Sequence, residues 1–278
     1  MGRFDLRTRS GLISPIIQGQ SAVSFLLDLY PSSLVAFSVR LLRSTYTGKA
    51  LRVRRSSDNT ELDIGFNSSG DLDTTSLLSF CGALNGFVTT WYDQSGSGNN
   101  LTQTTAANQP IIVNGGALTL RNGKPYIQSS TTQWLRLTTD IITPVSLNYS
   151  YWMTYEKDTA GNNPILLQGG ATFHWLEYGA SQYITNADII TISSLYAINT
   201  LYLSNTITNY AVGATIYRNG SSLGTRGALT SAAATTFIPS NIARTAKITM
   251  AEFVFYASNK TTDKTNIDSI INNYYAIY

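Results

Sequence analysis

Hydrophobic and polar residues alternate along much of this chain, in short runs separated by turn-forming residues. The runs 50–55 and 60–66 alternate with a period of two, and Ser, Asp and Asn fill positions 56–59 between them. A period of two places successive side chains on opposite faces of a strand. The pattern therefore predicts a β-hairpin here.

Further runs have the same strand-like character and the same turn-rich separators. They are Gly86–Tyr92, Ile111–Val113, Trp134–Leu137, Tyr149–Tyr155, Phe173–Tyr178, Leu201–Leu203, Ala211–Arg218 and Ile248–Tyr256. The pair Asn219-Gly220 directly follows one run, and both residues tolerate the positive φ of a tight hairpin turn. We therefore expect many short antiparallel strands.

Two segments have helical signals instead. Asp73 is a suitable N-cap for a short helix near 73–81, which Gly82 would end. A C-terminal helix is predicted near 262–275, capped by Thr261 or Thr262, because an apolar stripe recurs there at helical spacing. Asp263 would lie in its first turn and Asp268 on its polar side. The stripe consists of Ile267, Ile270, Ile271 and Tyr274. The predicted fold class is all-β, a two-sheet antiparallel jelly-roll sandwich with these two helices.

The first twenty residues differ from the rest and form a predicted arm, followed by a single jelly-roll domain over 21–278. The arm combines basic with apolar side chains, of which Arg3, Arg7, Arg9, Ile16 and Ile17 are the candidates for docking to a partner. A frayed terminus is the alternative. Docking copies would associate as a homo-oligomer, for which we expect a trimer.

Composition narrows the class of protein. Of 278 residues, 43% are hydrophobic, 11% aromatic and 13% charged, which supplies a core and excludes a disordered chain. The formal net charge is +3, with the positive charge concentrated in residues 1–55. Arg52 and Arg54 alternate as the exposed side of a strand would, so no nucleic-acid partner is expected.

The few sulfur and imidazole groups exclude several kinds of site. Cys81 and His174 are the single cysteine and histidine, so neither an intrachain disulfide nor a Cys/His metal site is expected, and no cofactor is. The apolar window 25–42 contains Asp28, Pro31 and Arg40. It therefore predicts no membrane insertion, and no secretory signal is visible at the N-terminus.

Specific motifs cover the first half of the chain. Phe25–Pro31, Ser38–Gly48, Arg52–Asn59, Asp63–Phe66 and Val88–Gly96, continued by Asn99–Gln103, Ala106–Pro110 and Asn122–Pro125, resemble the start of the alpha-L-arabinofuranosidase B catalytic domain. The closing half resembles concanavalin-like, laminin-G-like domains through Ile216–Gly220 and Ala251–Tyr256. Both resemblances imply a jelly roll.

The resemblance implies fold more than activity. The same pattern recurs in bacteriophage structural proteins. The hydrolase has adjacent cysteines in a disulfide beside its sugar site, whereas this chain has Cys81 alone. No catalytic residue of the hydrolase can be carried over to a position of this sequence.

Two groups of residues are candidates for binding a glycan. Trp91, Tyr92, Asp93 and Gln94 combine an aromatic face with carboxylate and amide partners for hydroxyls. The alternative is that Trp91 fills the core while Asp93 and Gln94 tie down the glycine-rich loop. Glu177, crowded by His174, Trp175 and Tyr178, is the second group, with an outward-facing strand residue as its alternative.

A retaining glycosidase needs two carboxyl groups about 5 Å apart. The second half offers Glu156, Asp158, Glu177, Asp188, Glu252, Asp263 and Asp268, of which Glu177 is the best acid candidate. Asp58, Asp63, Asp71 and Asp73 lack the spacing of a calcium loop. We therefore assign no catalytic and no metal residue.

These features together predict a non-enzymatic bacteriophage virion protein, a capsid decoration, head fibre or tail-associated component. Its partners would be other virion proteins, reached through the arm, and a host-surface glycan. The alternative is a secreted carbohydrate-binding module or an arabinofuranosidase-like glycoside hydrolase. The expected location is the virion, or the extracellular space under the alternative.

Overall fold

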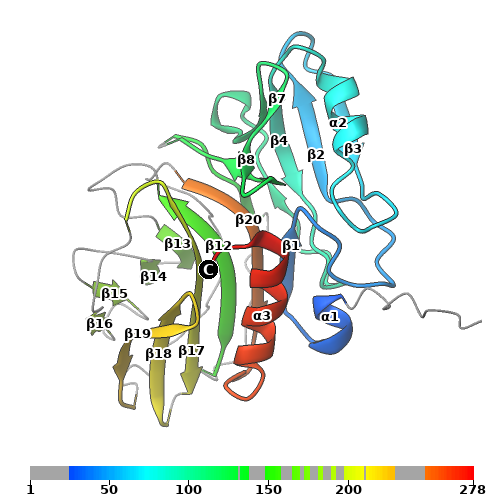
Figure 1. The fold of residues 1–278 in the computed structure, drawn as a ribbon. Coiled ribbons are helices and arrows are strands. Elements are labelled where there is room, and N and C mark those ends of the chain that lie inside the picture. The colour runs from blue at the N-terminus through cyan, green and yellow to red at the C-terminus, as the bar shows by residue number, and fades with distance from the viewer. Residues whose placement is uncertain are drawn as a thin grey trace, which may run out of the picture.

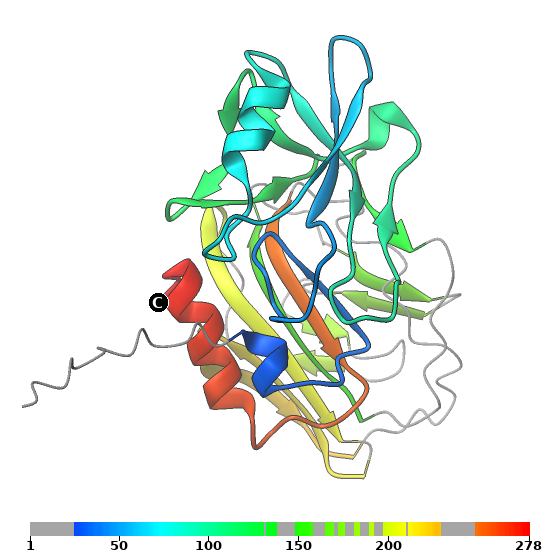
Figure 2. The same cartoon turned by 90° about the vertical axis from the view of Figure 1, so that its right-hand side faces the viewer.

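A computed structural model describes residues 25–130, 132–137, 148–157, 165–169, 172–175, 181–183, 189–191, 197–209, 211–228 and 248–278. The side chains of 165–169, 172–175, 181–183 and 189 are not described. Strands predominate, they pair antiparallel, and they form a sandwich-like arrangement (Figures 1 and 2). The predicted mostly β, antiparallel architecture is thereby confirmed.

Within the described residues, fourteen strands join into one hydrogen-bonded sheet. Its main path runs in the order β11 (Arg136–Leu137), β5 (Leu101–Thr102), β4 (Gly86–Trp91), β6 (Ile111–Asn114), β10 (Ile127–Gln128), β20 (Ile248–Tyr256), β12 (Ser150–Lys157), β17 (Thr200–Asn209), β18 (Gly213–Arg218) and β19 (Ser221–Arg226). Beside this path, β1 (Val35–Ser38) pairs with β20, β2 (Leu51–Arg55) with β4, β3 (Glu61–Ile64) with β2, and β7 (Ala117–Leu118) with β6.

Strands β12 and β20 lie at the centre, and every residue in them is buried. Both faces of this part of the sheet are therefore covered. On one face lies α3 (Lys264–Tyr275), with α1 (Leu26–Leu29) next to it (Figures 1 and 2). Separate two-stranded sheets are formed by β13 (Ile165–Gly169) with β14 (Thr172–Trp175), β15 (Ser181–Tyr183) with β16 (Ile189–Thr191), and β8 (Leu120–Arg121) with β9 (Lys124–Pro125).

Hairpin β15–β16 packs on the face of the sheet opposite to α3. A Cβ on Gly224 of β19 would come within 2.5 Å of the Thr191 carbonyl oxygen of β16. Gly224 pairs with Ile216, which is fully buried, whereas the neighbouring Tyr217 contacts Lys264 of α3. Successive strand residues point to opposite faces, so the two faces have different covers.

The helices correct three expectations for the C-terminal segment. Helix α3 begins at Lys264 with Asp263 at the N-cap, so neither Thr261 nor Thr262 caps it and Asp263 precedes the first turn. Asp268 is 3% exposed rather than on a solvated side, because it binds an indole of the sheet. Helix α2 (Thr74–Cys81) begins after Asp73, whose Oδ1 accepts from the Ser76 amide at 3.0 Å. Within the described ranges, no helix is long and apolar enough to cross a membrane.

Trp91, at the end of β4, lies in the main core. It is 1% exposed, and its ring centre is 5.9 Å from that of Phe37. We expect Trp91→Ala to lower the free energy of unfolding by about 3–5 kcal/mol in urea denaturation, because it removes a buried indole and leaves a cavity. Leu62→Ala, at a 39% exposed position, is the control, with an expected change within about 0.5 kcal/mol. A loss below about 1 kcal/mol for Trp91→Ala contradicts the core role.

Candidate functional site

The carboxylate of Asp93 is used inside the protein, where it is 4% exposed. Its Oδ1 accepts hydrogen bonds from the amides of Ala36 and Ser95, each at 2.9 Å. Its Oδ2 accepts from the Asn99 amide at 3.1 Å. Asp93 therefore holds the glycine-rich loop against β1.

The side-chain amide of Gln94 is fully buried and serves the same region. Its Oε1 accepts from the Leu42 amide at 2.8 Å, and its Nε2 donates to the carbonyls of Ser38 and Arg40 at 3.1 and 2.9 Å. These contacts satisfy backbone groups that no strand partner satisfies. The structure thus places Trp91, Asp93 and Gln94 in the interior, without access to a glycan.

Tyr92 is the partly exposed member of the motif. Its hydroxyl donates to Asp63 Oδ1 at 2.7 Å, and Arg52 Nε lies 3.1 Å from the same oxygen. Burial and the hydrogen bond to Asp63 raise the pKa of Tyr92 to about 12. The phenol therefore stays neutral at ordinary pH.

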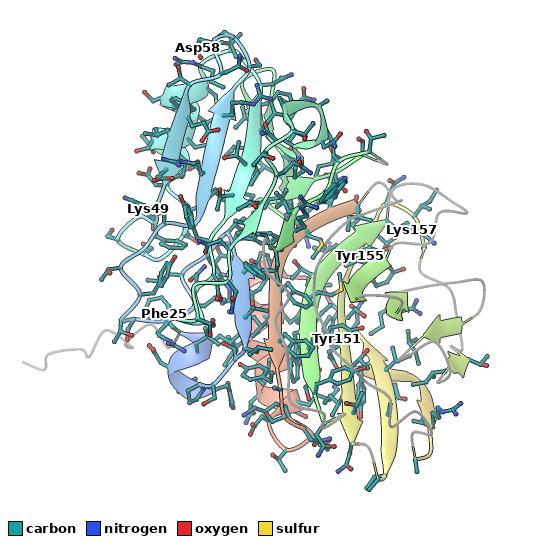
Figure 3. All side chains as sticks on the ribbon, turned by 180° about the vertical axis from the view of Figure 1, so that it is seen from behind. Phe25, Lys49, Asp58, Tyr151, Tyr155 and Lys157 are labelled. Atoms are coloured by element: carbon teal, nitrogen blue, oxygen red, sulfur yellow. The ribbon has the colours of Figure 1, made fainter. Side chains whose placement is uncertain are left out.

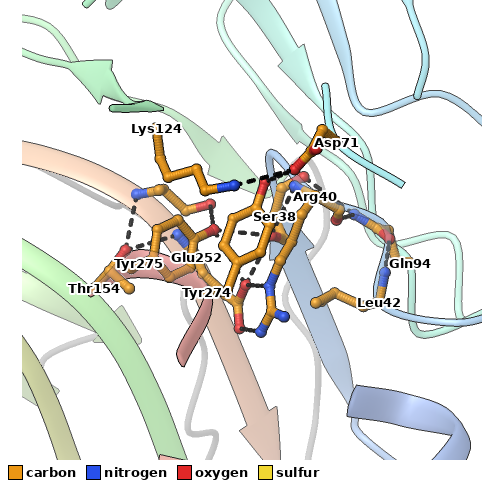
Figure 4. Close-up of polar contacts among 11 residues, drawn as sticks. Ser38, Arg40, Leu42, Asp71, Gln94, Lys124, Thr154, Glu252, Tyr274 and Tyr275 are labelled. Carbon is orange, nitrogen blue, oxygen red and sulfur yellow. Dashed lines mark hydrogen bonds and ion pairs between the residues drawn. The ribbon is translucent and has the colours of Figure 1, made fainter. Parts of the chain in front are cut away.

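A buried cluster joins the first half of the chain to its C-terminal end; we call Ser38, Arg40, Glu252, Tyr274 and Tyr275 the seam cluster (Figure 4). Arg40 Nε and Nη2 donate to Glu252 Oε2 and Oε1 at 2.7 and 2.9 Å. Ser38 Oγ and the Tyr275 hydroxyl donate to Oε2 at 2.9 and 3.2 Å. The guanidinium carbon lies 4.7 Å from the ring centre of Tyr274.

The seam cluster is closed to substrate, since Arg40 is 7% and Glu252 0% exposed. Burial lowers the pKa of Arg40, but the facing Glu252 carboxylate raises it by more, so the net pKa is raised. Burial, together with Glu252, raises the pKa of Tyr275 well above its usual value. The guanidinium is held charged and the phenol neutral, which fits support rather than proton transfer.

Two other carboxylates of the second half are also held by partners. Asp268 Oδ1 accepts from Trp152 Nε1 at 2.7 Å, and Lys264 Nζ donates to its Oδ2 at 2.6 Å. Glu156 Oε1 accepts from Arg121 Nη2 at 2.6 Å. Among the described residues, no group of three or more His, Cys, Asp or Glu side chains could hold a metal ion.

The candidate carboxylates therefore fall into two sets. Glu156, Glu252 and Asp268 are buried and form ion pairs, and Asp263 accepts from Lys260 at 3.1 Å. The others, Asp158, Glu177 and Asp188, lie outside the described residues, as does Tyr178. His174 and Trp175 belong to β14 and pair with Leu167 and Ile165 of β13.

At one end of the central sheet the chain leaves β12 and later enters β17, and those remaining acids lie in the sequence between these two points. Lys157 at the end of β12 pairs with Thr200 at the start of β17, and Glu156 pairs with Thr249 near the start of β20. The chain thus leaves β12 and enters β17 at the same end of these central strands. Figure 3 shows Tyr155 and Lys157 at this end of β12, with Tyr151 farther along it. This sheet end is our candidate functional site.

The basic residues near the start of the chain fall into two groups. Arg3, Arg7, Arg9, Ile16 and Ile17 lie outside the described residues. In β2, Arg54 Nε donates to Gln109 at 2.6 Å, and Arg55 forms an ion pair with Asp58 at 2.6 Å. The basic strand is thus partly neutralised within the domain.

Sequence reasoning missed the pairing of Arg40 with Glu252 and that of Trp152 with Asp268. Arg40 and Glu252 are 212 positions apart, and no local pattern signals such a contact. The i,i+4 spacing of Lys264 and Asp268 was visible in the sequence. It indicates the ion pair but not that the sheet buries it.

The first half of the chain matches a known family. Residues 30–125 match the family model described as "Alpha-L-arabinofuranosidase B, catalytic". The probable alpha-L-arabinofuranosidase B of Aspergillus flavus is 43% identical over 67 residues, which are 24% of this chain and 13% of that protein. The Aspergillus fumigatus protein is 35% identical over 94 residues, 32% of this chain and 19% of that protein. The matches thus span a small part of each relative.

Solved structures are similar over most of the chain. A GH54 α-L-arabinofuranosidase soaked with a cyclic sulfate inhibitor has a TM-score of 0.67 and 18% identity, covering 88% of this chain and 63% of that one. An arabinofuranosidase complexed with arabinofuranosyl-α-1,2-xylobiose has a TM-score of 0.66 and 17% identity, with the same coverage. At this identity the likeness establishes a shared fold. The chain spans less than two thirds of these structures.

These matches overturn part of the expectation from sequence. The predicted role as a non-enzymatic bacteriophage virion protein, whether capsid decoration, head fibre or tail component, is wrong, because the matching family model and relatives are arabinofuranosidases. The virion location has no support from these comparisons. The resemblance to the arabinofuranosidase B catalytic domain is confirmed for residues 30–125.

We expect Glu252→Gln to lower the free energy of unfolding by about 3–5 kcal/mol, because it leaves the Arg40 charge buried without its carboxylate. Glu61→Gln is the matched control, since that carboxylate is 39% exposed beside Arg52, and should cost at most about 1 kcal/mol. Chemical denaturation measures both. Equal losses for the two variants contradict a supporting role for the seam cluster.

Alkaline pH tests the environment of Tyr92. Because its pKa is raised to about 12, the folded state favours the neutral phenol. That stabilisation is present below pH about 10, the unfolded value, and is lost as the pH rises through about 12. The difference in stability between the wild type and Tyr92→Phe should shrink over this interval in urea denaturation at stepped pH. A constant difference contradicts the assignment.

Proposed function

We propose that this chain is a glycoside hydrolase domain of the arabinofuranosidase B type, which cleaves terminal α-L-arabinofuranosyl residues from a carbohydrate. One observation carries the proposal: a segment of 67 residues is 43% identical to a probable alpha-L-arabinofuranosidase B. The shared fold over 88% of the chain supports it. An extracellular location and a glycan partner accompany the proposal, as does a jelly-roll connection of the strands.

The packing supports treating residues 21–278 as a single domain. Ser38 and Arg40 of the matched segment bind Glu252 of β20. From the same segment, Asn122 Nδ2 donates to the carbonyls of Tyr275 and Ala276 at 3.1 and 2.7 Å. A segment bound at both of its ends to the C-terminal half belongs to the same folding unit. The arm of residues 1–20 remains a proposed docking element for a second copy.

Elimination names the residues proposed for the chemistry. Glycoside hydrolysis by two carboxyl groups needs an acid and a base or nucleophile facing the same glycosidic bond. Ion pairs engage Glu156, Glu252, Asp263 and Asp268. We therefore assign the two roles to members of the set Asp158, Glu177 and Asp188, with Glu177 as the acid. The segments with these residues connect to the sheet end at Lys157 and Thr200.

The purified chain should release nitrophenol from 4-nitrophenyl α-L-arabinofuranoside. Glu177→Gln should lower kcat by about 10²–10⁴-fold, the contribution of a general acid. Asp158→Asn and Asp188→Asn, measured in parallel, should identify the second carboxylate. Glu61→Gln, on β3, is the control and should keep full activity.

Two results would contradict this proposal. The first is a folded wild-type protein without turnover of the aryl arabinofuranoside. The second is turnover that none of the three acid substitutions reduces.

A further inference from the structure

A groove lies at the end of the sheet remote from the candidate site. It has a volume of about 480 Å³, within the 300–1,000 Å³ range typical of ligand sites. Strands β17, β18 and β19 form one side through Ile207, Thr215 and Thr225, and the segment before α3 forms the other through Asn259 and Thr261. It is an open channel between a sheet face and a loop.

The groove exists because α3 covers only part of this face. Asn205 of β17 donates to Asp268 of α3 at 3.0 Å, so the helix covers the sheet at that level. Ile207 lies two residues farther along the same face, beyond the helix start at Lys264. There the sheet meets the preceding segment instead, which is fixed by a hydrogen bond of 3.0 Å from Asn259 Nδ2 to the Thr208 carbonyl.

The lining combines apolar surface with hydroxyl groups. Ile207, Val212 and Tyr217 supply the apolar part. Thr215 and Thr225 face each other across β18 and β19, and their hydroxyls have no hydrogen-bond partner among the described residues. Side chains paired across neighbouring strands lie on one face, so both hydroxyls can reach a molecule in the groove.

The described lining carries little charge, which favours a neutral ligand. Among the described lining residues none is acidic, and Arg226 is the single basic one. The nearby Lys264 is already bound to Asp268 at 2.6 Å and lies 4.2 Å from the ring centre of Tyr217. A phosphate or a uronic acid chain would need several free cations, which this lining lacks.

We propose that this groove is a second carbohydrate site, which binds a neutral polysaccharide chain away from the bond that is cleaved. Sugar rings have apolar C–H faces that pack on side chains such as Ile207 and Tyr217, and hydroxyls that bond to threonine hydroxyls. The inference rests on the proposed function for its ligand class. It adds a site that would hold the polymer while its branches reach the candidate site.

The two sites are separated by the length of β17. Thr200 marks the candidate site and Asn209 the groove, so the strand spans about 30 Å between them at ~3.3 Å per residue. An aryl arabinofuranoside is too small to contact both sites. A polymer of many sugars can contact both sites. Assays with the small and the large substrate therefore report on the two sites separately.

The test replaces Thr225, an exposed residue of β19, by tryptophan to fill the groove. Thr225→Trp should weaken binding to soluble arabinoxylan at least tenfold in isothermal titration calorimetry, without a change in turnover of the aryl arabinofuranoside. Ser221→Trp, exposed on the same strand but outside the groove, is the matched control and should bind like the wild type. Thr225→Ala removes the hydroxyl together with the small γ-methyl group and should weaken binding severalfold.

Several outcomes overturn the inference. They are unchanged arabinoxylan binding by both Thr225 variants, equal loss in the Ser221→Trp control, no arabinoxylan binding by the wild type, and preferential binding of polygalacturonate, an anionic chain. If Thr225→Trp fails to fold, Thr225→Ala decides. Arabinoxylan binding that depends on Thr225, in a protein without aryl arabinofuranoside turnover, supports the groove and contradicts the hydrolase proposal alone.

Discussion

The buried ion pair of Arg40 and Glu252 is the constraint on which the two halves of this protein depend. Both charges are removed from water, which costs several kcal/mol per ion unless the partners are well placed. The bidentate geometry, two additional hydroxyl donors and two aromatic rings supply that compensation. Because Arg40 follows β1, Glu252 lies in β20 and the tyrosines end α3, the compensation is complete only when all three elements are docked.

Hydrogen bonds also satisfy the backbone amides around Glu252. The pairing of β12 with β20 shifts register between Met153 and Tyr155. At this irregularity Thr154 Oγ1 accepts from the amides of Ala251 and Glu252, each at 3.0 Å. A side chain thus replaces the ladder partners that the bulge removes. The amides of Ala251 and Glu252 therefore stay paired beside the ion pair.

The sequence predicts elements whose signals are local and fails where partners are distant. The bounds of β20, Ile248–Tyr256, coincide with the predicted run because alternation and hydrophobicity agree there. Strand β12 continues past the predicted Tyr155 to Lys157, since β17 pairing continues and Arg121 neutralises Glu156. The helical period places Asp268 on the solvent side, but in the structure its carboxylate is buried and accepts a hydrogen bond from the indole of Trp152. Only tertiary contacts carry that information.

The prediction of a glycan-binding motif has a similar limit, for a chemical reason. In the motif from Trp91 to Gln94, an aromatic ring beside a carboxylate and an amide suits either a sugar or a set of unpaired backbone groups, because both offer donors and acceptors. In the structure, the side chains of Asp93 and Gln94 form hydrogen bonds with backbone groups. Residue type alone could not separate these uses; burial does.

The segment that matches the family model also contains much of this buried framework. The matched segment, 30–125, contains the ion-pair arginine and the buried Asp93 and Gln94, whose partners are fixed by the backbone path. Replacing one of these residues would break several bonds at once and leave buried polar groups without partners. The buried framework therefore limits which side chains this segment can carry.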